Sequence, residues 1–174
     1  MRRGSGDGRS SFWTTHRKSA KRFSSQAEAA VILQTLTFSR LTTAPLTFIS
    51  ADTFIVFKNR LLGKPHTDKE AEKMLNMLNG KAHSVITDFT IMDTASKKIL
   101  SRSVETKVYF KKLGRKEINA YVRSKEPLDK AGAYAIQGLG SVFIERIDGD
   151  FLNVVGLPLL ALAESLKKFG ITVA

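Results

Sequence analysis

The chain has 174 residues, of which 43% are apolar, and its 28 Lys and Arg against 16 Asp and Glu give a net charge of +12. A chain of this length suits one domain, with or without a tail, and can bury a sizeable core. It contains no cysteine, which excludes disulfides, thiolate catalysis and cysteine-ligated zinc or iron–sulfur sites. No apolar stretch approaches the length that spans a bilayer, so no membrane segment is expected.

The positive charge is concentrated at the start of the chain. Residues 1–45 are predicted to form a basic, Ser- and Thr-rich, partly disordered segment ahead of one domain that spans residues 46–174. An Arg-rich, Ser-rich start with few acids is also typical of an organelle transit peptide, which is the alternative interpretation of this segment. After residue 50 the charges are evenly mixed, so nucleic acid is not the expected partner.

Helices and strands are predicted in mixed order from residue 46 onwards. Leu46–Phe57 is mostly apolar and β-prone, which predicts a strand covered on both faces. Thr67 and Glu70 have the spacing of a capping box, and apolar residues then recur at helical spacing as far as Gly80. A helix is therefore predicted to begin at Thr67 and to end at Gly80.

The second half of the chain predicts a hairpin followed by smaller elements. Val85–Met92 and Ile99–Phe110 are predicted as antiparallel strands, because the polar stretch Asp93–Lys98 links them. The remaining elements are a short helix, a strand and a last helix, predicted over Lys116–Val122, Val142–Ile147 and Leu159–Phe169. This order predicts an α/β fold with helices packed on a sheet.

Asp52 is the first candidate for chemistry, because a carboxylate inside an apolar strand is costly unless it is paired, hydrogen-bonded or bound to a metal. It either caps a turn or pairs with a lysine, or it serves as a metal ligand or general base at the end of a strand. Lys64 lies in a Gly-Lys-Pro turn before a predicted helix. It is either an exposed loop lysine or a phosphate-binding residue.

The segment Asp129–Gly138 fits neither helical nor strand periodicity and holds three polar residues, Asp129, Lys130 and Gln137, among small ones. Such a segment is either a packed connection or the lining of a ligand site. The amide of Gln137 both donates and accepts, which suits reading the edge of a base. The three histidines are dispersed, and we assign them no role beyond the surface.

Taken together, several short motifs resemble the Maf family of nucleoside triphosphate pyrophosphatases. They follow the order of that family over about residues 50–173. The motifs are Ala51-Asp52-Thr53, Leu62-Gly63-Lys64-Pro65, Met74-Leu75 in a helix that ends at Gly80, Val104-Glu105-Thr106, Asp129-Lys130-Ala131-Gly132-Ala133-Tyr134, Ile136-Gln137-Gly138 and Asn153-Val154-Val155-Gly156-Leu157-Pro158.

The resemblance implies a Maf-type α/β fold, shared in outline with the inosine triphosphate pyrophosphatases. Helices then flank a mixed, curved sheet, and a cleft lies between two lobes. The resemblance also implies an activity: hydrolysis of a nucleoside triphosphate to the monophosphate and pyrophosphate. This activity would use a divalent cation, Mg²⁺ or Mn²⁺. The Ala-Asp-Thr form is similar to the branch that acts on dTTP and UTP, and modified nucleotides stay open as substrates. We expect a cytoplasmic homodimer.

The motif match also assigns roles to single residues. Asp52 would accept the proton of the attacking water and would bind the metal. Lys64 would hold phosphate, while Thr53 and Gln137 would help to select the base. In all, substrate binding is predicted for Thr53, Lys64, Asp129, Lys130 and Gln137.

The N-terminal segment departs from the family pattern. Residues 1–45 lack the Ser-x-Ser-Pro-Arg-Arg loop with which the family begins, so no role is transferred to any residue before Ala51. This departure predicts an altered or truncated N-terminus. The alternative function is therefore a catalytically impaired Maf-like nucleotide-binding or regulatory protein with a basic arm.

Overall fold

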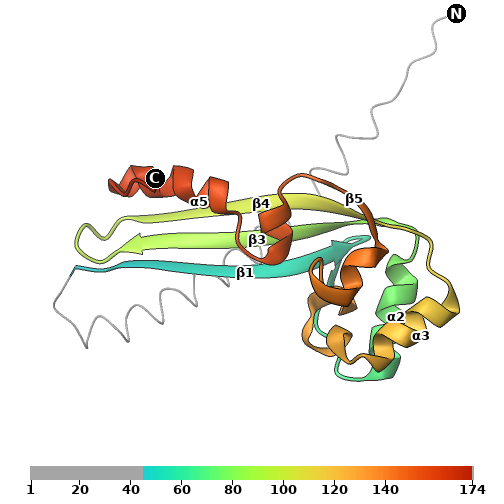
Figure 1. Cartoon of the computed structure of the whole chain (residues 1–174). Helices are drawn as coiled ribbons and strands as arrows, with labels where there is room; N and C mark the ends of the chain where they lie inside the picture. The colour runs from blue at the N-terminus through green and yellow to red at the C-terminus, as the bar shows by residue number, and fades with distance from the viewer. Residues whose placement is uncertain (1–44, 174) are drawn as a thin grey trace, which may run out of the picture.

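The fold is an antiparallel sheet with helices at both of its ends, seen in a computed structural model that describes residues 45–173 (Figure 1). The strands follow one another in the order β2-β1-β3-β4-β5, and neighbours in this order are hydrogen-bonded. The strands are β1 (Thr47–Phe57), β2 (Arg60–Leu62), β3 (Ala82–Asp93), β4 (Ile99–Phe110) and β5 (Ile144–Asp148).

Helices α2 and α3 lie at one end of the three long strands, and α5 lies along them at the other end (Figure 1). A run of three short 3₁₀ turns connects α3 to β5. The α-helices are α2 (Asp68–Leu78), α3 (Arg115–Arg123), α4 (Phe151–Val155) and α5 (Leu159–Leu166). The 3₁₀ helices are η1 (Glu126–Asp129), η2 (Ala131–Ala133), η3 (Gly138–Phe143) and η4 (Lys167–Phe169).

Strand β3 is the centre of the sheet because it pairs with β1 along one edge and with β4 along the other. Its side chains from residue 83 to residue 91 are buried. The hairpin predicted between β3 and β4 is confirmed, and Asp93 closes it by donating its N–H to the carbonyl of Lys98.

Helix α2 begins and ends where its sequence predicts. The Thr67 hydroxyl accepts the Glu70 N–H at 3.2 Å, and the Glu70 carboxylate accepts the N–H of His66 at 2.7 Å. Gly80 follows the helix with φ of +63°, a left-handed conformation that glycine adopts without strain. The face that α2 turns toward the sheet is fully buried and consists of Ala71, Leu75 and Leu78.

Two hydrophobic clusters fix the helices to one face of the sheet. The larger one packs α2 and α3 against Ile55, Val85 and Val108, while the smaller one packs α5 against Phe89 and Ile91. In β1 and β3 these are odd-numbered positions, which share a face because side chains alternate along a strand. The helices and the 3₁₀ turns thereby define the side of the sheet on which a pocket forms.

The predicted α/β fold is confirmed, but several of its elements differ from those predicted. All strand pairs among residues 45–173 are antiparallel, whereas a mixed sheet was expected. The strand expected over Val142–Ile147 begins only at Ile144, because residues 138–143 form η3 instead. The short helix α4 was not predicted, since five residues are too few to show helical periodicity. None of the helices between residues 45 and 173 has the length and apolar character needed to cross a bilayer.

Candidate functional site

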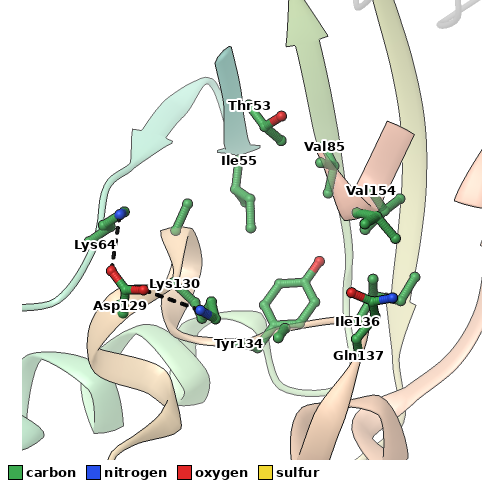
Figure 2. Close-up of a pocket in the computed structure, with 13 residues that line it drawn as sticks. Thr53, Ile55, Lys64, Val85, Asp129, Lys130, Tyr134, Ile136, Gln137 and Val154 are labelled. Carbon is green, nitrogen blue, oxygen red and sulfur yellow. Dashed lines mark hydrogen bonds and ion pairs between the residues drawn. The ribbon is translucent and has the colours of Figure 1, made fainter. Parts of the chain in front are cut away.

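A pocket of about 380 Å³ lies between the sheet and the 3₁₀ segment, and five of the six predicted site residues line it (Figure 2). Those five are Thr53, Lys64, Asp129, Lys130 and Gln137. The other lining residues are Ile55, Val85, Ala131, Tyr134, Ala135, Ile136, Val154 and Val155. In Figure 2, the two lysines lie on one side of the Tyr134 ring, and Gln137 lies on the other beside Val154.

The cationic end of the pocket consists of two lysines that share one carboxylate. Nζ of Lys64 lies 3.1 Å from Oδ1 of Asp129, and Nζ of Lys130 lies 3.3 Å from Oδ2 (Figure 2). These bonds, first from Lys64 and then from Lys130, hold the pKa of the Asp129 carboxyl below its usual range. All three side chains reach solvent, so the pairs can open at little cost. The end therefore carries a net positive charge next to open solvent.

A close backbone contact fixes Lys64 beside Lys130. Gly132 donates its N–H to the carbonyl of Gly63 at 3.0 Å, which joins the β2–α2 loop to η2. Gly132 has φ of +67°, and a Cβ at that position would lie 2.7 Å from Cδ1 of Ile55. Only glycine fits this contact, because any side chain would meet both the strained φ and the Ile55 side chain.

The opposite wall of the pocket belongs to α4, which polar contacts hold against the sheet. Asn153 is fully buried, and its Nδ2 donates to the Val85 carbonyl at 3.2 Å and to Oγ1 of Thr106 at 3.0 Å. Oγ1 of Thr53 lies 2.8 Å from that of Thr87 and donates to the Gly156 carbonyl at 3.2 Å. These bonds place Val154 and Val155 over the pocket.

The floor of the pocket is Tyr134, whose hydroxyl lies 2.7 Å from Nε2 of His83. Both side chains are buried, and the Phe110 ring packs edge-on against each of them. Burial lowers the pKa of His83 to about 4 and raises that of Tyr134 above its usual value. The surface position expected for His83 is thus wrong, because strand alternation points it, like Val85, toward the covered face.

Asp52 is the one predicted site residue that does not line the pocket. It is exposed in the middle of β1, not at a strand end, and its Oδ1 accepts the N–H of Thr53 at 2.9 Å. Since Thr53 points into the pocket, its neighbour Asp52 leaves the strand on the other face. On that face it lies directly across from Asp88 of β3.

The described residues do not form a ready-made metal site. No group of three or more His, Asp and Glu side chains between residues 45 and 173 is arranged to hold a metal ion. The carboxylate in the pocket, Asp129, is already paired with two lysines, and Asp52 points to the other face. We therefore derive no catalytic step through a protein-bound metal.

The sequence reasoning missed the apolar walls and the floor of the pocket. Ile55 and Val85 read as ordinary core positions, and only the register between β1 and β3, which places them opposite each other, brings both to the pocket. Tyr134 and Val154 did lie inside quoted family motifs, which was the signal available for them. His16 and the N-terminal segment lie outside the described residues.

The comparison with protein families concerns the sequence of most of the chain. The family model described as "Maf-like protein" matches residues 10–169. The chain belongs to the Maf family. The domain boundary expected at residue 45 stays a prediction.

Curated Maf-family relatives share about half of their aligned residues with this chain. The dTTP/UTP pyrophosphatase of Methanosarcina barkeri is 51% identical over 125 residues, which are 72% of this chain and 64% of that protein. The proteins of the same name from Pelotomaculum thermopropionicum and Bacillus cereus are 50% and 48% identical over the same length. The chain thus spans slightly less than two thirds of the length of these relatives.

Proposed function

We propose that the pocket binds a pyrimidine nucleoside triphosphate, dTTP or UTP, and that the protein hydrolyses it to the monophosphate and pyrophosphate. The observation that carries this proposal is the pocket itself, which places two lysines at one end and an amide side chain at the other. The names of relatives at about 50% identity, each a dTTP/UTP pyrophosphatase, support the choice of substrate.

The two ends of the pocket suit the two ends of such a nucleotide. Lys64 and Lys130 would leave Asp129 and bind phosphate oxygens, because a phosphate carries more negative charge than a carboxylate and more acceptor oxygens. Gln137 would pair with the base, since its amide offers both a donor and an acceptor to the N–H and carbonyl groups of uracil or thymine. Tyr134 and Val154 would pack against the apolar faces of the base and the sugar.

Hydrolysis requires water to attack the α phosphorus while the bond from that phosphorus to the bridging oxygen breaks and pyrophosphate leaves. The proton of the water must pass to a base, for which Asp52 is the prediction from the family motif. The orientation of Asp52 away from the pocket does not support this role. A divalent cation, Mg²⁺ or Mn²⁺, is proposed to enter with the triphosphate and to bind mainly through its oxygens.

The test is release of pyrophosphate from dTTP, UTP, CTP and GTP with Mg²⁺ or Mn²⁺. We expect turnover of dTTP and UTP, and an increase in KM of about tenfold or more for Lys64→Ala, because the variant loses a charge-assisted hydrogen bond to phosphate. Lys69→Gln, on the exposed surface of α2, is the matched control and should leave KM unchanged. Absence of both turnover and nucleotide binding in the folded protein would refute the proposal.

Asp52→Asn separates catalysis from binding in the same assay. If Asp52 is the base, the variant loses turnover and keeps its affinity for the nucleotide. Unchanged turnover would assign the base to another group and leave the binding proposal intact. Binding without any turnover in the parent chain would instead favour the catalytically impaired alternative. The homodimer and the cytoplasmic location also stay proposals, as does the use of modified nucleotides.

A further inference from the structure

Glu126 and Tyr121 hold the segment that carries Gln137, although neither of them lines the pocket. The Glu126 carboxylate accepts the N–H of Leu139 at Oε2 and that of Gly140 at Oε1, both at 3.1 Å. The Tyr121 hydroxyl donates to Oε1 of Glu126 at 2.9 Å. We call Glu126 and Tyr121 together the Glu–Tyr clamp.

The Glu–Tyr clamp forms hydrogen bonds to the backbone on both sides of Gln137. The oxygen of the Tyr121 hydroxyl also accepts the N–H of Ala135 at 3.3 Å. Ala135 precedes Ile136 and Gln137, which both line the pocket, and Leu139 follows them. One hydrogen-bonded unit therefore fixes the backbone before and after Gln137, which restricts the directions that its side chain can take.

The glycines of the segment fit the clamp closely. Gly138 has φ of +78°, and a Cβ there would lie 2.9 Å from Oε2 of Glu126. A Cβ at Gly140 would lie 2.6 Å from the Tyr121 hydroxyl oxygen. A side chain at Gly138 would meet the Glu126 carboxylate and a strained φ, and one at Gly140 would meet both the Tyr121 hydroxyl and, at 2.7 Å, the Ala135 carbonyl oxygen.

The protonation states of the two side chains suit these bonds at neutral pH. Partial burial would raise the pKa of Glu126, but the hydrogen bonds from Leu139, Gly140 and Tyr121 outweigh it and lower the pKa. Glu126 is then an anion that only accepts. Burial, together with the Glu126 carboxylate, raises the pKa of Tyr121, so its hydroxyl stays protonated and donates.

We propose that Glu126 and Tyr121 are positioning residues that set the nucleotide selectivity of the pocket by fixing Gln137. The selectivity part rests on the proposed function, because it requires that Gln137 reads the base. The structural part, that the clamp orders residues 135–140, does not require a ligand. The two parts can therefore fail separately.

The first experiment is hydrogen exchange of single amides in the full chain, measured by NMR. Glu126→Gln keeps the shape of the side chain but replaces one accepting oxygen with an NH₂ group, so either Leu139 or Gly140 loses its acceptor. We expect at least one of these two amides to exchange about tenfold faster, with little change in the central strand β3. Unchanged exchange rates at both amides would refute the proposal that Glu126 orders residues 135–140.

Glu117→Gln is the matched control. Glu117 is also a carboxylate that accepts a backbone N–H, that of Gly114 at 2.7 Å, but it caps α3 and pairs with Lys111. Its substitution should leave the exchange of Leu139 and Gly140 unchanged. Should Glu126→Gln fail to fold, Tyr121→Phe makes the same test at the Ala135 amide, which would lose its acceptor.

The second experiment measures equilibrium binding of the α,β-methylene analogues of UTP and CTP with Mg²⁺ present, because the methylene bridge cannot be hydrolysed. We expect Gln137→Ala to reduce the preference for UTP about tenfold, and Glu126→Gln to reduce it by a similar factor. The double variant should lose no more than Gln137→Ala alone, because the clamp acts through Gln137. Additive losses in the double variant, or full selectivity in Glu126→Gln, would overturn the selectivity role.

Failure of the proposed function gives a different result. If the parent chain binds neither nucleotide, the pocket is not a nucleotide site, and the selectivity role falls with it. The exchange experiment still decides whether Glu126 and Tyr121 order the segment. If the parent binds UTP selectively and Gln137→Ala does not alter the selectivity, nucleotide binding stands and the positioning role through Gln137 is rejected.

Discussion

Oγ1 of Thr53 in β1 donates to the main-chain carbonyl of Gly156 at 3.2 Å, although 103 residues separate them in the chain. This bond joins the strand that enters the pocket to the end of α4, the helix that forms its opposite wall. We therefore expect this hydroxyl group to help hold α4 at its distance from β1, which two variants of Thr53 can test.

Replacing Thr53 with valine removes the hydroxyl and keeps the shape of the side chain. We expect Thr53→Val to lower the free energy of unfolding by about 1–2 kcal/mol, since the part-buried Gly156 carbonyl loses its partner. We also expect weaker UTP binding, because α4 is no longer tied to β1. Thr53→Ser restores the donor and should keep both properties. Urea unfolding and UTP titration check this, and equal losses in both variants would contradict it.

Gly132 and Gly63 form a matched pair of glycines joined by one backbone hydrogen bond. Gly132→Ala should lower the free energy of unfolding by about 1–3 kcal/mol, because the new methyl group meets Ile55 at 2.7 Å and φ is +67°. Gly63→Ala should change it by less than about 0.5 kcal/mol, since no atom lies within 4 Å of a Cβ there. Thermal unfolding of the two variants is the measurement, and an equal loss would speak against the contact.

Asn153 ties α4 to β3 and β4 from a fully buried position. Asn153→Ala leaves the Val85 carbonyl without this donor and creates a cavity, so we expect a loss of roughly 2–4 kcal/mol of stability. Asn153→Asp should be worse at neutral pH, because it buries a negative charge next to the Val85 carbonyl oxygen. Unfolding of both variants at neutral and at acidic pH would show this, and Asp should approach Ala as pH falls.

His83 should make stability depend on pH. Its pKa in the folded state is about 4, below the usual 6.5, so the native state excludes a proton that the unfolded chain binds. The neutral His83 ring therefore contributes to the free energy of unfolding fully above about pH 6.5. This contribution is lost as pH falls toward 4, so the free energy of unfolding should fall by roughly 2 kcal/mol between pH 7 and pH 5. Glu126 and Asp129, whose pKa values are lowered, act mainly below this range.

The check is urea unfolding of the parent chain and of His83→Gln at these two pH values. The variant lacks the titrating ring and should show a much flatter dependence on pH, even though its stability is lower at pH 7. A dependence as steep as that of the parent would mean that another group is responsible.

Much of this fold could be predicted because its long elements carry strong local signals. The α2 helix has a cap, a buried stripe and a terminal glycine, and β3 and β4 are joined by a polar turn. Only the last two residues of η3, Val142 and Phe143, were predicted as strand, because both have high β propensity. The hydrogen bonds from the Leu139 and Gly140 amides to the Glu126 carboxylate could not be predicted, because local propensity does not reveal contacts between residues this far apart in the chain.

The site likewise contains residues whose position could be predicted from the sequence and residues for which it could not. Lys64, Asp129, Lys130 and Gln137 were identified from their motifs, and the structure brings them to one pocket. The direction of Asp52 could not be predicted, because it depends on which face of β1 the helices cover. The partner of His83 depends on where the 3₁₀ segment folds back, which the sequence of β3 does not contain.

The pocket joins parts of the chain that are far apart in sequence. The Gly63–Gly132 and Thr53–Gly156 bonds close long loops, and contacts of this kind form slowly and late in folding. A chain emerging from the ribosome therefore has no complete pocket until residues 129–156 have been synthesised and α4 has docked on the sheet. Any ligand that binds only to the completed pocket will stabilise the folded domain by an amount that increases with the ratio of its concentration to its Kd.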